Sequence, residues 1–372
     1  MSLAERIAGK RVLICAGSGG VGKTTCSAAL ALGLAARGRR VAVVTIDPAK
    51  RLADALGLEE LGNEPRLVDP ARFAGHGIEV RGELWAMMLD AKATFDELID
   101  RLAPDERTRE DVLANRIYQE LSSAVAGSQE FTAVAKLFDL VRSERFDVVV
   151  LDTPPSRNAL DFLDAPDRLT NFFEGRALRV FLAPTGFAAR VMGRGTGVVF
   201  AVLKRVTGVD LLRDVSTFFR SLGGLLDGFR ERAAAVKAVL SDPSTTFLIV
   251  TSPERDPVEE AIFFHRKLRE AGMPFGGLIV NRVQPADGLD GDPHAVEAEL
   301  AGALGADLAR RVAQTYAEAQ LLARRDEACL AHLRAEVGEP DPVLVPQLDG
   351  DVHDLDGLIS VHDHLFGQGS DR

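Results

Sequence analysis

The fold is decided by residues 17–24, which read Gly17-Ser18-Gly19-Gly20-Val21-Gly22-Lys23-Thr24. They fit the phosphate-binding loop pattern G-x-x-x-x-G-K-[ST]. An apolar run over residues 11–16 predicts a buried strand before the loop, and residues 25–37 predict a helix after it, with Gly38 as the stop signal. A glycine-rich turn without a ligand would share the glycines, but the Lys-Thr pair and both flanking elements favour a nucleoside triphosphate site.

Each part of this loop has a role that follows from residue type. Glycines let the backbone direct its N–H groups at a phosphate, at the positive end of the following helix. Lys23 supplies a point charge for the β- and γ-phosphates, and the Thr24 hydroxyl is suited to ligate Mg²⁺. The candidate nucleotide-binding residues of the loop are Gly17, Ser18, Gly19, Gly20, Val21, Gly22, Lys23, Thr24 and Thr25.

Two aspartates follow predicted strands. Asp47 follows residues 41–46, and Asp152 follows the apolar run 146–151. Ligands of open α/β sheets lie beyond the carboxyl ends of the strands, so both carboxylates are expected near the loop. There they can orient an attacking water or hold water on Mg²⁺. For Asp47, capping of the next helix fits the position equally well; for Asp152, a purely structural role is the alternative.

Two long stretches lie between predicted strands. Residues 91–142 have a mostly helical pattern, and residues 160–240 are too long for a crossover helix and too apolar for a solvated loop. The second stretch either buries its phenylalanines on itself or on the sheet, or forms a groove for a helix of another polypeptide. We predict an α/β fold with a mainly parallel, doubly wound sheet, as a single domain over 1–372 with helical insertions at these two places.

The C-terminal third returns to strands and helices. Apolar runs predict strands at 246–251, 277–281 and 343–346, and a long amphipathic helix is expected at about 308–337. Asn281 ends one of these strands on the ligand side, where its amide can read a base edge.

Composition excludes several classes of protein. A net charge of −11 without a basic stripe argues against nucleic acid as a partner. The most apolar run, 198–203, is far shorter than the ~20 residues needed to span a bilayer. Cys15, Cys26 and Cys329 form no C-x-x-C pair, which indicates a reducing, cytoplasmic location rather than a disulfide framework or zinc site.

Together, the loop, Asp47-Pro48-Ala49 and Asp152-Thr153-Pro154-Pro155 resemble the ArsA-type ATPase family. That family includes the arsenite-pump ATPase and the guided-entry ATPase that escorts tail-anchored membrane proteins. The resemblance covers the whole chain and extends to Ser128-Gln129-Glu130, the strand ending at Asn281 and Val345-Pro346-Gln347.

The resemblance implies a P-loop NTPase that hydrolyses ATP with Mg²⁺. In it, Asp47 resembles the switch I carboxylate that positions water, and Asp152 the switch II aspartate. Asn281 resembles the adenine reader, with Pro346 in the neighbouring base-site loop. It also implies a homodimer, or a heterodimer with a paralogous ATPase, with nucleotide at the interface. In targeting members, the helical insertions bind a hydrophobic helical client.

Departures from the family pattern matter for activity. The family loop begins Gly-Lys-Gly-Gly, and that lysine reaches the partner's nucleotide, but here the position is Ser18. Such a trans-acting cation can be worth ~10³–10⁵ in rate, so either hydrolysis is slow or Arg51, Arg157 or a partner subunit replaces it. Lys50 and Asn158 occupy places where the family switches contain histidine. No cysteine pair follows Asn281, so a zinc-tied dimer is not implied, and the cysteines are not clustered for metalloid.

Three functional hypotheses remain. The first is an ATPase whose nucleotide state rearranges a helical subdomain that binds or targets a hydrophobic client. The second is a regulatory or pseudo-ATPase subunit that works only with a lysine-bearing paralogue. The third is a MinD/ParA-like positioning ATPase, against which stand the acidic balance and a C-terminal helix without a basic face.

Overall fold

The computed structural model describes residues 2–47, 49–116, 118–119, 128–153, 225–286, 288–338, 341–348, 350, 352 and 354–367. Pro48, Pro154, Pro155, Arg157, Asn158 and the insertion from 160 to 224 lie outside the described residues. The chain divides into two compact units. We call Met1–Met87, Glu144–Ala159 and Ser241–Arg372 the sheet unit, and Met88–Ser143 with Leu160–Leu240 the helical unit.

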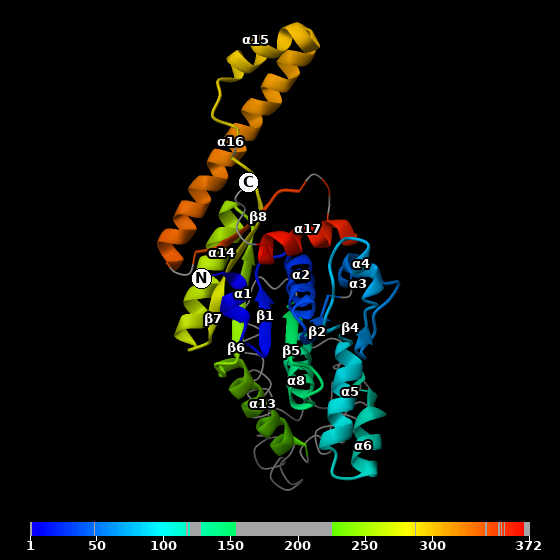
Figure 1. Ribbon diagram of the computed structural model, residues 1–372. Helices are drawn as coiled ribbons and strands as arrows, with labels where there is room; N and C mark the ends of the chain where they lie inside the picture. Colours follow the sequence, from blue (N-terminus) through cyan, green and yellow to red (C-terminus); the bar gives the residue numbers. More distant parts are fainter. Residues whose placement is uncertain are drawn as a thin grey trace, which may run out of the picture. The chain divides into compact units, whose positions relative to one another are not determined.

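An eight-stranded sheet forms the centre of the sheet unit, in the order β3-β4-β2-β5-β1-β6-β7-β8 (Figure 1). The pairs β1/β5, β1/β6, β2/β5, β6/β7 and β7/β8 are parallel, and β3/β4 is antiparallel. The expected mainly parallel α/β sheet is therefore confirmed. The strands are β1 Val12–Ala16, β2 Arg40–Thr45, β3 Arg66–Leu67, β4 Glu83–Met88, β5 Val148–Asp152, β6 Thr245–Thr251, β7 Phe275–Val283 and β8 Val343–Pro346.

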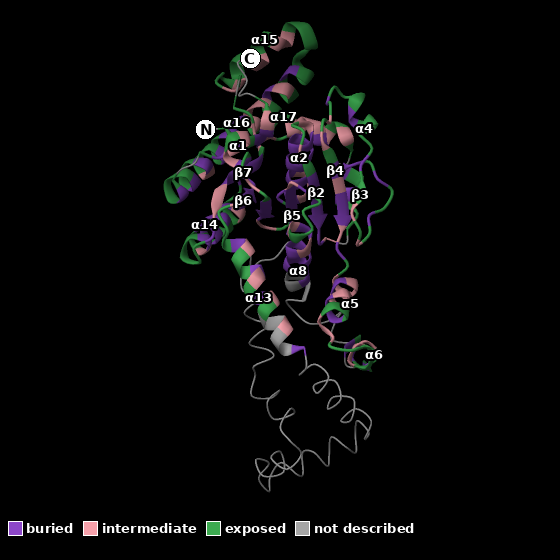
Figure 2. Cartoon of the chain, turned by 60° about the horizontal axis from the view of Figure 1, so that its bottom comes forward, coloured by how far each residue is buried: buried purple, intermediate pink, exposed green. Residues whose placement is uncertain are grey.

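The register of the central strands decides what meets at their carboxyl ends. Asp152 in β5 lies opposite Cys15 of β1 on one side and opposite Thr45 of β2 on the other. Every residue of β1 and β5 is buried, as expected for parallel strands covered on both faces, and Figure 2 shows these strands in the colour of buried residues. The last residue of β5 is thus a carboxylate in a buried position between two strands.

Helices of the sheet unit pack on this sheet and on each other. Helix α2 is buried over most of its length, and α17 packs against it. Gly33 is required at this contact, because a Cβ there would lie 2.1 Å from Cε2 of Phe366. The helices are α1 Leu3–Ile7, α2 Lys23–Ala36, α3 Arg51–Ala55, α4 Ala71–Ala74, α14 Arg255–Glu270, α15 Pro293–Leu304, α16 Ala306–Val337 and α17 Leu355–Phe366.

The helical unit is described over α5 Ala91–Leu102, α6 Glu106–Leu113, α8 Ser128–Arg142 and α13 Leu226–Ser241. Asp139 of α8 joins three of these helices, since it pairs with Arg101 of α5 at 2.7 Å and with Arg232 of α13. Among the helices that the structure describes, none combines the length and apolar character needed to cross a membrane. The assignment of these helices to insertions in one ATPase domain stays a prediction.

Candidate functional site

The phosphate-loop backbone depends on its glycines. Gly20 and Gly22 have φ values of 81° and 93°, in the left-handed region that side chains disfavour. Gly17 faces β6 so closely that a Cβ would lie 2.0 Å from the carbonyl oxygen of Val250. Gly22 is the N-cap of α2, so the first N–H groups of this helix are open at the loop. The result is a concave backbone at a helix N-terminus, which is suited to bind an anion.

Lys23 closes over this loop. Its Nζ donates a hydrogen bond to the Ser18 carbonyl oxygen at 2.7 Å, and the residue is only 6% exposed. Burial lowers the pKa of the Lys23 ammonium, while the charges of Asp152 and Asp47 act in the opposite direction. The ammonium therefore lies at the loop with two carboxylates nearby to compensate it.

Asp152 lies beneath the loop and is 1% exposed. Its Oδ2 accepts hydrogen bonds from the Thr24 hydroxyl at 2.7 Å and from the Thr45 hydroxyl at 2.8 Å. Its Oδ1 is also buried but has no hydrogen-bond partner among the described residues. Burial raises the pKa of Asp152 to about 6, against the lowering effect of the two hydroxyls and of Lys23. A buried carboxylate oxygen without a hydrogen-bond partner is energetically unfavourable unless a cation or a water molecule contacts it.

This donor set fits a hydrated magnesium ion. Mg²⁺ prefers oxygen ligands and keeps several waters, so that it is held by few side chains together with substrate phosphates. The Thr24 hydroxyl lines the cavity described below, and the open Oδ1 of Asp152 can accept from a water of such an ion. Thr24 would thus hold the ion directly and Asp152 through water, and both assignments stay predictions.

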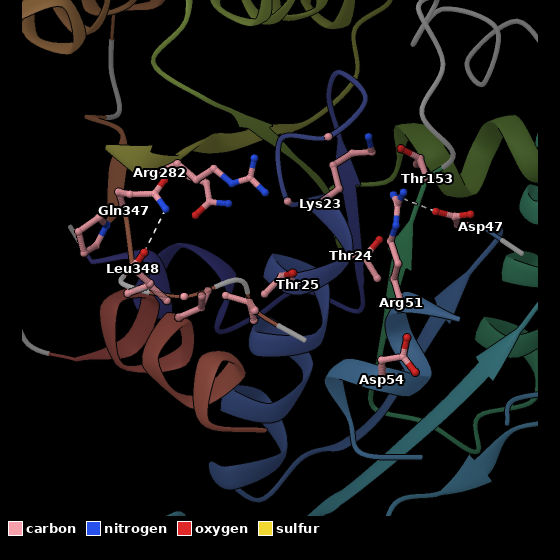
Figure 3. A pocket seen from close by; sticks show the side chains of 17 residues that line it. Lys23, Thr24, Thr25, Asp47, Arg51, Asp54, Thr153, Arg282, Gln347 and Leu348 are labelled. Carbon is pink, nitrogen blue, oxygen red and sulfur yellow. Dashed lines mark hydrogen bonds and ion pairs between the residues drawn. The ribbon is translucent and has the colours of Figure 1, made fainter. Parts of the chain in front are cut away.

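Asp47 uses both of its oxygens within its own segment. Oδ1 accepts a hydrogen bond from the Ala49 N–H at 2.9 Å, and Oδ2 lies 3.3 Å from Nη1 of Arg51 (Figure 3). The hydrogen bond from Ala49 is the contact expected if Asp47 caps the following turn. Asp47 also lines the cavity, as it would have to if it positions a water molecule. Both interpretations of Asp47 therefore stay open, and the second requires that Arg51 gives up its ion pair.

A cavity of about 430 Å³ extends from the loop toward the ends of β7 and β8. The Asn281 side chain of β7 is held against the loop, because its Nδ2 donates to the Val21 carbonyl oxygen at 2.9 Å. A Cβ at Gly22 would lie 2.2 Å from the same Nδ2, so this glycine also admits Asn281. The cavity lining comprises Gly20, Gly22, Lys23, Thr24, Thr25, Asp47, Arg51, Asp54, Thr153, Asn281, Arg282, Pro346, Gln347, Leu348, Gly350, Val352 and Val361.

The predicted site residues fall into two groups. Those that line the cavity are Gly20, Gly22, Lys23, Thr24, Thr25, Asp47, Asn281 and Pro346. Those that do not line it are Gly17, Ser18, Gly19, Val21 and Asp152. Asp152 still reaches the site through Thr24, and Val21 through Asn281.

Sequence reasoning missed several residues of the site. The Thr45 hydroxyl donates to Asp152, but nothing in the sequence distinguishes Thr45 from other strand residues. The two residues meet because the register of β2 and β5 places them opposite each other. Arg282 directly follows the predicted base reader, which is the single signal that could have identified it. Pro346 was predicted at this place, but Leu348, Gly350, Val352 and Val361 carry no motif, and they line the cavity because the chain from β8 to α17 folds back to α2.

Ser18 contacts an acidic side chain. Its hydroxyl donates a hydrogen bond to Oε2 of Glu260 on α14; Ser18 is half-buried and Glu260 is exposed. The face of the loop at which the resemblance implies a lysine therefore carries a carboxylate.

Known proteins that are similar to this chain identify its family. Residues 10–301 match the family described as anion-transporting ATPase (ArsA_ATPase). The chain is 34% identical to ATPase get3 of Aspergillus terreus over 288 residues, which cover 76% of each chain. It is 28% identical to ATPase GET3 of Malassezia globosa over 274 residues, or 73% of this chain and 72% of the relative. It is 26% identical to ATPase GET3C of Arabidopsis thaliana over 288 residues, or 76% and 69%. The chain belongs to the ArsA family of ATPases.

Proposed function

We propose that this chain binds and hydrolyses ATP with Mg²⁺ at the cavity beside the phosphate loop. The observation that carries the proposal is the arrangement of Asp152, whose Oδ2 is held by the hydroxyls of Thr24 and Thr45 while Oδ1 is buried and open. A carboxylate held in this way, directly behind a phosphate loop, is expected at a site for a hydrated cation and a triphosphate.

Different groups at the loop would bind the phosphates and the cation. The N–H groups at the start of α2 and the Lys23 ammonium bind the phosphates, and they stabilise negative charge as it moves toward the leaving group. Bound Mg²⁺ supplies charge neutralisation on the phosphate oxygens. Thr24 would hold the ion through its hydroxyl oxygen while its hydroxyl hydrogen still donates to Asp152 Oδ2, so Asp152 would be coupled to the occupancy of the site.

Asp47 is the proposed residue for positioning the attacking water. It lines the cavity and lies at the end of β2, but its Oδ2 is paired with Arg51. When Arg51 turns toward the phosphates, it would release Oδ2 and bring a cation to the nucleotide in the same movement. Arg51 is therefore one proposed substitute for the family lysine at the position of Ser18, because it lines the same cavity.

We further propose that nucleotide state is passed to the helical unit, which binds a hydrophobic helical client. Support comes from membership of the ArsA family, from relatives named as GET3 ATPases, and from chain connectivity. The chain leaves Asp152 and enters the helical unit at Leu160, a few residues later. An order change in a segment beside the γ-phosphate is a common way to move an attached element. A dimer and a cytoplasmic location belong to this proposal.

The test is ATP hydrolysis by the wild type, Lys23→Ala and Asp47→Asn. We expect Lys23→Ala to lose binding and turnover, and Asp47→Asn to bind ATP but turn over slowly. Equal rates for all three proteins would contradict the enzymatic part of the proposal, and loss of binding in Asp47→Asn would assign this residue to structure instead.

The hydrogen bond between Ser18 and Glu260 favours a second candidate, a regulatory subunit. A carboxylate at this face cannot stabilise a partner's phosphates, but it can pair with a cation from another chain. A lysine-bearing paralogue would fit it. The discriminating measurement is solution mass and turnover with and without ATP, alone and with such a paralogue. Turnover only in the mixture supports this candidate, and robust turnover by the isolated chain contradicts it.

A further inference from the structure

Arg282 has an unusual backbone conformation. Its φ of 62° lies in the left-handed region, which among the described non-glycine residues is shared only with Glu144. The pairing of β7 with β8 shifts its register between Val280 and Val283, around the same residue. Irregular pairing of this kind re-aims a side chain, and strained backbone persists where the surroundings hold it, commonly at ligand sites. The distortion gives a reason to ask what the Arg282 side chain does.

The side chain is directed into the nucleotide cavity. Arg282 lines the cavity, and in Figure 3 it lies between Gln347 and Lys23 with its guanidinium pointing toward the phosphate loop. The residue is exposed, and its side chain has no hydrogen bond, ion pair or ring contact with any residue that the structure describes. An arginine that is held in strain and aimed into a cavity without a protein partner is a candidate for contact with the ligand.

Two parts of a nucleoside triphosphate can bind a guanidinium group, namely the phosphates and the face of the base. The phosphate end already has Lys23 and the N–H groups of the loop. The base end, beside Asn281, has an apolar wall that includes Pro346, Leu348, Val352 and Val361, and no aromatic side chain lines the described cavity. Leu348 and Arg282 lie on opposite sides of a gap in Figure 3. A planar guanidinium stacks well on an aromatic face, so it can serve as the second wall.

We propose that Arg282 determines base binding in this protein, with its guanidinium stacked on the purine ring of ATP opposite the apolar wall. Asn281 complements this contact at the ring edge. Because its Nδ2 is engaged by the Val21 carbonyl oxygen, its Oδ1 is left to accept from an exocyclic amino group, which adenine has at this edge. The proposal rests on the proposed function, since it assigns one contact of the ATP that the site is proposed to bind.

The experiment compares the binding of two probes, Mg²⁺-ATP and Mg²⁺-tripolyphosphate, to the wild type, Arg282→Gln, Arg282→Lys and a control. Glutamine and lysine are strained at a positive φ to the same degree as arginine, so neither substitution changes the backbone strain at this position. Arg311→Gln is the control, because it removes an exposed arginine on α16. We expect Arg282→Gln to weaken ATP binding by roughly 3- to 30-fold and to leave tripolyphosphate binding unchanged. Arg282→Lys should stay weakened, because it retains the charge but not the planar group.

Other outcomes overturn the proposal. Equal weakening of both probes, or recovery of ATP binding in Arg282→Lys, would assign the side chain to the phosphates. Unchanged ATP binding in Arg282→Gln would remove any contact with the nucleotide. Unfolding temperatures measured without nucleotide separate a structural defect from a lost contact, because a contact with the ligand leaves them at the wild-type value. Failure of the proposed function is distinguishable, since in that case the wild type itself would bind neither probe.

Discussion

The two ends of the cavity that we propose for ATP, the phosphate end at the loop and the base end at β7 and β8, are built in different ways. The phosphate end consists of one continuous segment, in which Gly20 and Gly22 shape the backbone and Lys23 closes over it. The base end is assembled from separate segments, with Asn281 and Arg282 at the end of β7 and Leu348 following β8. A phosphate is recognised by backbone N–H groups and a charge, which a short motif can supply. A base requires walls and an edge contact, which only distant segments can supply together.

Gly22 is where the two ends meet. It belongs to the phosphate loop, yet its missing Cβ makes room for the Asn281 amide, which in turn donates to the Val21 carbonyl oxygen. The two ends are therefore in direct contact, and they differ only in whether one segment or several segments of the chain form them. The predictions below act first on the phosphate end, then on the contact between the ends, and last on the base end.

The largest effect is expected for Lys23→Ala, which removes the phosphate-end charge. Turnover should fall by roughly 100- to 1,000-fold, because a fixed cation at the developing charge is lost. The measurement is steady-state ATP hydrolysis, with Lys267→Ala as control, since that lysine pairs with Glu270 on an exposed face of α14. A rate for Lys23→Ala equal to that of the control would break the comparison, because the phosphate end would then not depend on its motif.

A pH effect of about 3 kcal/mol is expected from Asp152 in the protein without nucleotide or Mg²⁺. Its pKa is raised from 3.8 to about 6, so the folded protein binds this proton more tightly than the unfolded chain does. The free energy of unfolding should therefore fall as pH rises from about 4 to about 6, by roughly two pKa units at about 1.4 kcal/mol each. Chemical denaturation across this range should reveal the slope.

Asp152→Asn is the matched variant for this pH effect. It retains an oxygen that can accept from the two threonine hydroxyls but does not titrate, so its stability should exceed that of the wild type above pH 6 and approach it at pH 4. Parallel curves for the two proteins would show that Asp152 carries no raised pKa in the folded state.

Gly22→Ala tests the contact between the ends. We expect a loss of roughly 1–3 kcal/mol in the free energy of unfolding, because alanine is strained at a φ of 93° and its Cβ would meet Asn281 Nδ2. In Gly22→Ala/Asn281→Ala the second contribution disappears, so the two substitutions should cost less together than the sum of their separate effects. Additive costs, measured by denaturant unfolding, would mean that the two ends are independent.

The smallest change in stability is expected for Arg282→Gly, which should raise the free energy of unfolding and weaken ATP binding. It relieves the strain of a φ of 62°, so the protein without nucleotide should gain roughly 0.5–1 kcal/mol, while ATP binding weakens through loss of the guanidinium. Glu144→Gly is the control, because Glu144 has a φ of 53° but does not line the cavity. It should gain similar stability and retain ATP affinity. A gain in affinity for Arg282→Gly would reverse our assignment of the base end.

Particular elements explain which parts of the fold could be predicted. The strand predicted at 343–346 coincides with β8, and that predicted at 246–251 differs from β6 by one residue, because short apolar runs bounded by polar or turn-forming residues are strong signals in the sequence. Every residue of β6 is buried, whereas in β8 only Val345 is. The helix α15 was not predicted, because its apolar residues do not gather on one helical face, and none of its residues is buried. The two exposed residues of β3 likewise carry no pattern.

The phosphate loop, the mainly parallel α/β sheet and the membership of the ArsA family could be recognised before folding is considered, because they depend on local backbone chemistry and on the order of short segments. Three contacts could be known only from the folded chain: Thr45 donates to Asp152, Arg51 pairs with Asp47, and Arg282 lines the cavity. Strand register, an ion pair and a left-handed backbone produce these three contacts. Each arises from packing between parts of the chain whose relation no single segment encodes.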